Sequence, residues 1–169
     1  MAEMDPINRV LGSLPPEITA TDPDVVARYL TDFRRFRTGA ARAVLRPRST
    51  AEVQAIVTLC AAHGVPLVPQ GGNTSYCAAA TPSPAGNELV LSLERLNGVR
   101  AIDAANLSLT AEAGCVLSVL QEAADAAGLM LPLDLGSRQS CQLGGALSTN
   151  AGGISVLKYG MARDLVLGL

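Results

Sequence analysis

The chain has 169 residues, which is enough for one domain or two small lobes with a real core. Hydrophobic residues make up 49% of it and charged residues 17%, a composition that excludes a disordered chain. The formal net charge is −2 and no basic stripe is present, so we expect no nucleic-acid partner. The cluster formed by Arg34, Arg35 and Arg37 is too short to change that expectation.

Apolar runs and cysteine spacing narrow the class of protein further. No stretch of about 18 uncharged apolar residues is present, so no membrane span is expected. The N-terminus is acidic and lacks a signal-peptide core, which predicts a cytoplasmic protein. The four cysteines and the single histidine do not have the spacing of metal ligands, so we expect no metal site and no disulfide framework. We expect reduced and mostly buried thiols at Cys60, Cys77, Cys115 and Cys141.

Residues 1–40 are predicted to form an N-terminal helical arm. Ile7, Val10, Leu11 and Leu14 recur at helical spacing, and Pro15-Pro16 ends that helix. Asp22 is a plausible N-cap for a second helix that continues to Leu30.

Residues 41–98 are predicted to form a first α+β lobe with strands at 43–45, 65–68 and 89–93. Ser49 and Glu52 have the spacing of a capping box at the start of a helix, and Gly64 is its expected C′ residue. The single histidine, His63, falls at this helix end, where capping or surface exposure is favoured over catalysis.

Residues 99–169 are predicted to form a second α+β lobe. Strands are expected at 99–103, 107–113 and 129–132, with a helix over 116–127 that Gly128 ends. Polar glycine-containing loops follow at 135–145 and 148–153, where Asp134 and nearby Lys158 are interpreted as loop or surface residues. The chain ends in an apolar strand-like run, 164–169, which is typical of a truncated domain.

Two glycine pairs suggest a dinucleotide site. A pyrophosphate needs several backbone N–H donors that converge on it without side-chain obstruction, and hydroxyl groups add further donors. Gly71-Gly72 lies beside Thr74 and Ser75, and Gly144-Gly145 lies near Ser140, Thr149 and Asn150. Tight turns are the competing interpretation for either pair alone. No G-x-G-x-x-G, P-loop or G-x-S-x-G pattern is present, which argues against a Rossmann NAD site, a P-loop and a hydrolase elbow.

Longer motifs resemble a known family. Arg46-Pro47-Arg48-Ser49-Thr50, Pro69 to Thr74, Pro132 to Ser137, Gly144-Gly145, Thr149 to Gly153 and Tyr159-Gly160 occur in that order. Together they resemble the FAD-binding domain of the vanillyl-alcohol oxidase/PCMH flavoprotein family. The chain is most similar to its branch of D-2-hydroxyglutarate and D-lactate dehydrogenases and glycolate oxidase subunits.

The resemblance implies an α+β fold, a two-lobed FAD-binding PCMH-type domain that is incomplete at the C-terminus. It implies non-covalent FAD, because no histidine lies near the first glycine loop. Carried over by motif, the cofactor-binding residues are Pro69, Gln70, Gly71, Gly72, Asn73, Thr74, Ser75, Gly136, Ser137, Ser140, Cys141, Gln142, Gly144, Gly145, Thr149, Asn150, Ala151 and Gly152.

The same resemblance implies the activity of the parent protein. Such relatives oxidise a D-2-hydroxy acid, of the 2-hydroxyglutarate, lactate or glycolate type, by hydride transfer to the flavin. The cap domain that binds the substrate, and the metal and substrate ligands, would lie beyond Leu169. We therefore name no catalytic residue and no metal ligand in this chain, expect the fragment alone to be inactive, and leave the electron acceptor open.

One departure from the family pattern supports an alternative function. Relatives continue the first loop with further glycines, where this chain has Ser75, Ala78 and Ala79. A β-carbon at a left-handed position costs about 1 kcal/mol, which would reduce FAD affinity. The alternative is a non-catalytic flavin-binding remnant or regulatory module. An α+β interaction domain without a ligand is less favoured, because it leaves both glycine loops unexplained.

Overall fold

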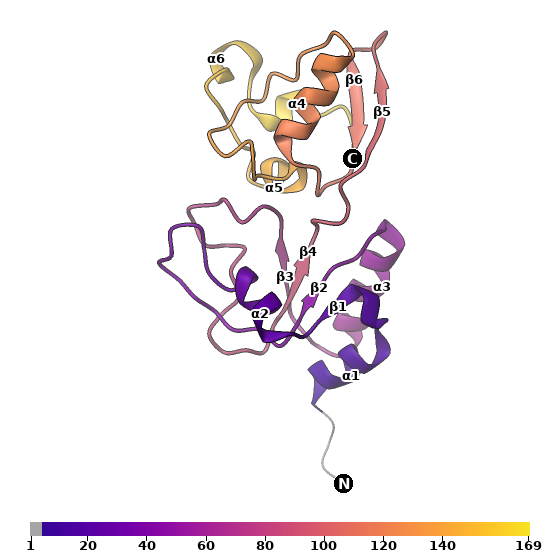
Figure 1. The fold of residues 1–169 in the computed structure, drawn as a ribbon, viewed down its shortest axis with the longest axis vertical. Coiled ribbons are helices and arrows are strands. Elements are labelled where there is room, and N and C mark those ends of the chain that lie inside the picture. Colours follow the sequence, from indigo (N-terminus) through magenta and orange to yellow (C-terminus); the bar gives the residue numbers. More distant parts are fainter. Residues whose placement is uncertain (1–4) are drawn as a thin grey trace. The chain divides into compact units, whose positions relative to one another are not determined.

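The computed structural model describes residues 5–169, which fall into two compact units, one ending at Arg95 and one beginning at Leu96. The first unit is built on a four-stranded sheet with the order β1-β2-β4-β3 (Figure 1). Strands β2 (Val44–Leu45) and β3 (Leu67–Gln70) both pair in parallel with β4 (Leu89–Ser92). The predicted strands are therefore confirmed, and β4 separates the two strands of the predicted β-α-β unit.

Strand β1 (Thr19–Ala20) is an addition that the sequence analysis missed. It pairs antiparallel with β2 at the edge of the sheet. Two residues are too few to show an alternating pattern, which is why no strand signal was visible there.

Successive side chains of this sheet point to opposite faces, and helices cover both faces (Figure 1). Leu45 and Leu89 point to the face covered by α1 (Pro6–Ser13) and α3 (Thr50–Ala62), whereas Val44 and Val90 pack with Val26 on the other face. Val26 ends the short helix α2 (Pro23–Val26), which η2 (Ala27–Tyr29) continues, and η1 (Pro16–Ile18) precedes β1. All four residues of β4 are buried, as expected for a parallel strand covered on both sides.

Helix-end signals in the first unit are largely confirmed. The Asp22 carboxylate accepts the Asp24 N–H at 2.8 Å, and Gly64 follows α3 with a φ of 63°. The Ser49 hydroxyl accepts the Glu52 N–H at 3.2 Å, as a capping box requires. The return bond differs from the prediction, because the Glu52 carboxylate accepts the N–H of Arg48 instead of that of Ser49.

The second unit combines a two-stranded hairpin with short helices (Figure 1). Strands β5 (Val99–Asp103) and β6 (Ser108–Ala111) pair antiparallel, and α4 (Leu117–Ala126) follows. Helix α5 (Leu143–Ser148), helix α6 (Val156–Tyr159) and η3 (Ala162–Leu165) complete it. Its core contains Leu117, Leu133, Cys141, Ala146 and Ala162.

Two strand predictions in the second unit are wrong. Residues 129–132 are irregular, because Pro132 has no N–H to donate and no neighbouring strand is available; Leu131 still packs against the core. Residues 164–169 contain the end of η3 and no strand. The Asp164 carboxylate accepts the Met161 N–H at 2.7 Å, which closes a helical turn where an extended strand was expected.

No helix within residues 5–169 is both long and apolar enough to cross a membrane. Three of the thiols, Cys60, Cys115 and Cys141, are buried, and Cys77 is exposed. Burial raises the pKa of the Cys60 and Cys115 thiols.

Candidate cofactor-binding site

The predicted site residues fall into two groups, one in each unit. In the first unit, residues 71–75 follow β3 directly; we call this segment the amide loop. None of the five N–H groups from Gly71 to Ser75 donates a hydrogen bond to another residue of the described part of the chain. The loop is half-buried, so these donors lie within a largely formed surface and still need an acceptor from outside.

Two side-chain amides hold the amide loop in place. Gln70 is 2% exposed, and its Nε2 donates to the carbonyl oxygens of Tyr29 at 2.9 Å and Ala80 at 2.7 Å. Asn73 Nδ2 donates to the carbonyl oxygen of Thr31 at 2.8 Å. These side chains therefore position the loop, and its backbone N–H groups remain available to a ligand.

The conformation of the loop decides between the two interpretations of Gly71-Gly72. Neither glycine has a positive φ, so neither position requires a left-handed backbone. Asn73 occupies the left-handed position instead, with a φ of 49°, which asparagine tolerates better than most residues. What the two glycines contribute is the lack of a side chain, which allows close approach to the backbone.

The three residues that replace the further glycines of the family pattern, Ser75, Ala78 and Ala79, differ in backbone conformation. Ala78 has a φ of 55°, so a β-carbon does stand in the left-handed region there. Ser75 and Ala79 are not in that region, and the predicted strain does not arise at either of them.

A charged network lies at the same end of the sheet as Gln70. The Tyr29 hydroxyl donates to Glu94 at 2.9 Å, and the Arg46 guanidinium pairs with the same carboxylate. Burial of the phenol, and after that its bond to the Glu94 carboxylate, raises the pKa of Tyr29. Because Gln70 binds the Tyr29 carbonyl, this network supports the backbone on which the amide loop rests.

In the second unit, two predicted segments lie against each other. The Ile154 N–H donates to the Asp134 carbonyl oxygen at 3.3 Å. A β-carbon added to Gly153 would lie only 1.8 Å from that same oxygen, so only glycine fits there. This contact brings the 149–153 loop beside the 134–142 turn.

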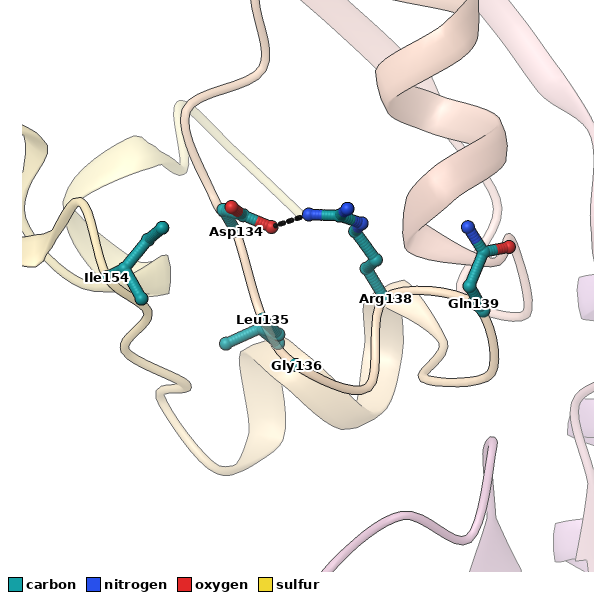
Figure 2. Close-up of a pocket in the computed structure, with 6 residues that line it drawn as sticks. All are labelled: Asp134, Leu135, Gly136, Arg138, Gln139 and Ile154. Carbon is teal, nitrogen blue, oxygen red and sulfur yellow. Dashed lines mark hydrogen bonds and ion pairs between the residues drawn. The ribbon is translucent and has the colours of Figure 1, made fainter.

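A pocket of about 360 Å³ opens between these segments. Figure 2 shows Asp134 and Arg138 pointing toward each other, with an ion pair of 2.7 Å, and Ile154 across from them. Of the predicted site residues only Gly136 lines this pocket. Sequence reasoning missed Arg138, Gln139 and Ile154; the one available signal was the i,i+4 spacing of Asp134 and Arg138.

Helix α5 carries the second glycine pair, which was expected in a loop. The Gly144 N–H donates to the Ala113 carbonyl oxygen at 2.7 Å, so it is not free for a ligand. A β-carbon at Gly144 would lie 3.0 Å from the Ala113 β-carbon, and this packing contact explains the glycine. The Gly145 N–H has no partner among residues 5–169, and neither do those of Gly152 and Gly153.

Other predicted residues of the second unit differ in what they can offer a ligand. Cys141 is 5% exposed and belongs to the core, so its thiol packs inside the unit. The Thr149 hydroxyl donates to Gly145, and the Asn150 side chain accepts the Arg163 N–H at 3.0 Å. Gln142 is 8% exposed, and its Oε1 is buried without a hydrogen-bond partner in the described residues.

These donors and acceptors fit a dinucleotide. Unpaired N–H groups suit pyrophosphate oxygens, which only accept hydrogen bonds, and the unpaired Gln142 oxygen suits an N–H or O–H donor of a ligand. Residues 5–169 contain no group of three His, Cys, Asp or Glu side chains that could hold a metal ion.

The α+β fold and its unpaired backbone donors fit a dinucleotide-binding protein, and comparison with known proteins identifies the family. The family model described as "FAD binding domain" matches residues 41–169. The chain belongs to this FAD-binding family, and the two-lobed α+β fold predicted from its motifs is confirmed.

Relatives in sequence give the same family assignment. The D-2-hydroxyglutarate dehydrogenase of Xanthomonas citri pv. viticola is 42% identical over 149 residues, which are 88% of this chain and 31% of that protein. The mitochondrial D-2-hydroxyglutarate dehydrogenase of Bos taurus is 39% identical over 154 residues, 91% of this chain and 28% of that protein. The chain thus spans less than a third of the length of these relatives.

A solved structure of alkyldihydroxyacetonephosphate synthase matches with a TM-score of 0.83 and 22% identity. The match covers 97% of this chain and 32% of that one. At this level of identity the likeness shows the shared fold.

Proposed function

We propose that this chain binds FAD without a covalent bond, and that the amide loop holds its pyrophosphate through backbone N–H groups. The observation that carries the proposal is the row of unpaired N–H groups from Gly71 to Ser75, held in place by Gln70 and Asn73. In the second unit, Gly145, Gly152 and Gln142 are the groups with free hydrogen-bonding capacity toward the cofactor.

Non-covalent binding follows from the side chains near the amide loop. No histidine lies in it, and His63 is at the C-terminus of α3. Cys77 is the exposed thiol nearest to it in the sequence. Acid precipitation of the yellow protein should release all flavin into the supernatant, both for the wild type and for Cys77→Ser. Flavin that stays in the wild-type pellet contradicts the proposal.

The parent protein, we propose, is a dehydrogenase of a D-2-hydroxy acid. The names of relatives that are about 40% identical to this chain favour D-2-hydroxyglutarate as the substrate over lactate and glycolate. The bound flavin supplies a hydride acceptor, and the residues of this chain bind and orient it. A cap domain supplied by the rest of the parent would bind the hydroxy acid. A cytoplasmic location remains our prediction, and cell fractionation tests it.

The substitution Asn73→Asp tests whether the amide loop contributes to FAD binding. Aspartate tolerates the left-handed backbone, but it loses the donor to Thr31 and places a negative charge beside the phosphates. We expect FAD affinity, measured by flavin fluorescence, to fall by about tenfold or more. Asn87→Asp is the matched control, since Asn87 is exposed and lies outside the site. Equal FAD affinity in the wild type and Asn73→Asp would refute the role of the loop.

A second candidate, a flavin-binding module without turnover, is favoured by the strained Ala78. Rapid mixing of the flavin-loaded parent protein with D-2-hydroxyglutarate separates the two candidates. Bleaching of the flavin absorbance supports the dehydrogenase, and an unchanged spectrum with every D-2-hydroxy acid tested supports the module.

A further inference from the structure

A short hairpin spans residues 31–38 of the first unit, and apart from the Thr31 carbonyl that binds Asn73, the proposed function gives it no role. Thr31 and Thr38 form an isolated bridge, and their hydroxyl groups lie 3.1 Å apart. Asp32 is 3% exposed, and its carboxylate accepts the N–H groups of Arg34 and Arg37. Both carboxylate oxygens are therefore used to fix the backbone of the hairpin.

Exposed aromatic rings gather on this hairpin and on the chain just after the amide loop. Phe33 is 58% exposed, Phe36 76% and Tyr76 69%. These include both phenylalanines of a chain that is only 3% aromatic. The Phe33 and Tyr76 rings lie 5.8 Å apart between centroids, so they form one apolar surface. A contiguous exposed apolar surface of this kind is typical of an interaction site.

The same hairpin carries three exposed arginines that have no carboxylate partner among residues 5–169. The Arg34 guanidinium carbon lies 5.1 Å from the centroids of both Phe36 and Tyr76, so this cation is stacked and preorganised. Arg34, Arg35 and Arg37 are exposed and form no ion pair with any residue between 5 and 169. By contrast, each of four other arginines pairs with a carboxylate: Arg42, Arg46, Arg100 and Arg138.

We propose that this arginine–aromatic patch, formed by Phe33, Arg34, Arg35, Phe36, Arg37 and Tyr76, docks a separate protein whose contact face is acidic. Arginine, phenylalanine and tyrosine are enriched at the centres of protein interfaces, where aromatic rings are buried and arginine binds carboxylates through two hydrogen bonds. The partner's face therefore carries Asp or Glu beside an exposed aromatic or aliphatic side chain. The proposal does not depend on flavin binding.

The size and charge of the patch favour a protein over other polyanions. Three arginines on a chain of net charge −2 make no stripe that could follow a nucleic-acid backbone. Polybasic segments that bind anionic membranes carry about four to eight basic residues, more than this hairpin has.

A displayed library of random 12-residue peptides, selected against the immobilised 169-residue chain, tests the proposal. We expect the enriched peptides to carry Asp or Glu next to an aromatic or aliphatic residue. The affinity of a synthetic copy should fall by about tenfold or more for Arg34→Gln and for Phe36→Ala. It should also fall with added salt, because the arginines are exposed.

Two matched controls separate the patch from general surface properties. Arg28→Gln removes another exposed arginine, and Met130→Ala removes an apolar side chain that is 60% exposed; neither should change peptide affinity. Circular dichroism establishes that every variant is folded. The proposal is overturned if no peptide is enriched, or if the enriched peptides bind the patch variants as well as the wild type. It is equally overturned if single-stranded DNA or anionic vesicles bind the patch where peptides do not.

Discussion

Single residues carry the strain in the amide-loop region, and Ala78 is the clearest case. Its φ of 55° is a conformation that glycine adopts freely, whereas the neighbouring Ala79 does not share it. Ala78→Gly should therefore raise the free energy of unfolding by up to about 1 kcal/mol. Ala79→Gly should lower that free energy, because glycine only adds freedom to the unfolded chain there. Urea denaturation measures both variants, and destabilisation by Ala78→Gly would contradict the assigned strain.

Tyr29 links stability to alkaline pH. Its pKa is raised in the folded state by burial and by Glu94, so the unfolded chain loses the phenolic proton first. The stabilisation is complete below the ordinary pKa of 10.0 and is lost as pH rises through the raised folded value. Tyr29→Phe should be less stable than the wild type near neutral pH, since it loses the bonds to Glu94. The difference should shrink above pH 10, as followed by urea denaturation; a constant difference would contradict this assignment.

Among the elements, helix α5 contains two glycines with different surroundings. Alanine at 144 would crowd Ala113, whose β-carbon and carbonyl oxygen lie 3.0 and 3.1 Å from the added β-carbon. Alanine at 145 meets nothing within 4 Å. Gly144→Ala should lower the free energy of unfolding by about 1–3 kcal/mol, whereas Gly145→Ala should leave it unchanged or raise it by up to about 1 kcal/mol.

The same pair also tests the cofactor site. Gly145→Ala should weaken FAD binding although the protein is as stable as the wild type, because its β-carbon stands next to an N–H that we assign to the ligand. Thermal unfolding and FAD titration of the two variants measure both effects. If Gly145→Ala binds FAD as tightly as the wild type, the helix N-terminus takes no part in the site.

Local signals predicted the elements well wherever the chain itself supplies the hydrogen bonds. At the start of a helix, the side chains of Asp22 and Ser49 each accept a backbone N–H close by in the sequence. At the end of α3, Gly64 adopts a left-handed backbone conformation. The apolar run at 129–132 was misread because a strand also needs a partner, which no local pattern reveals. The strand prediction for 164–169 was wrong for a different reason, because a local bond from the Met161 N–H to the Asp164 carboxylate closes a helical turn there.

The motifs predicted which residues form the candidate site, but only the structure shows what each residue contacts. The sequence placed Gln70 and Asn73 in the site, yet only the structure shows that their side chains hold the amide loop. Gly144 was expected to bind ligand, and its N–H is instead bound to Ala113. Which N–H groups remain unpaired depends on contacts between distant segments, and these are not visible in a sequence.

In the whole molecule, each unit has its own set of unpaired hydrogen-bonding groups. The amide loop would hold the pyrophosphate, and Gly145, Gly152 and Gln142 would contact the flavin side. ADP, which lacks the flavin, should therefore be bound by the first unit alone. FAD, which carries the flavin as well, should raise the unfolding temperature more than ADP does.

Backbone amide NMR of the ¹⁵N-labelled chain, at 17.4 kDa, shows for each residue whether the amide loop binds the cofactor. Without ligand, the N–H groups of residues 71–75 should exchange rapidly with water. Addition of ADP should shift these resonances and slow their exchange, and FAD should extend the effect to Gly145 and Gly152. Resonances of 71–75 that stay unchanged at saturating FAD would contradict the account.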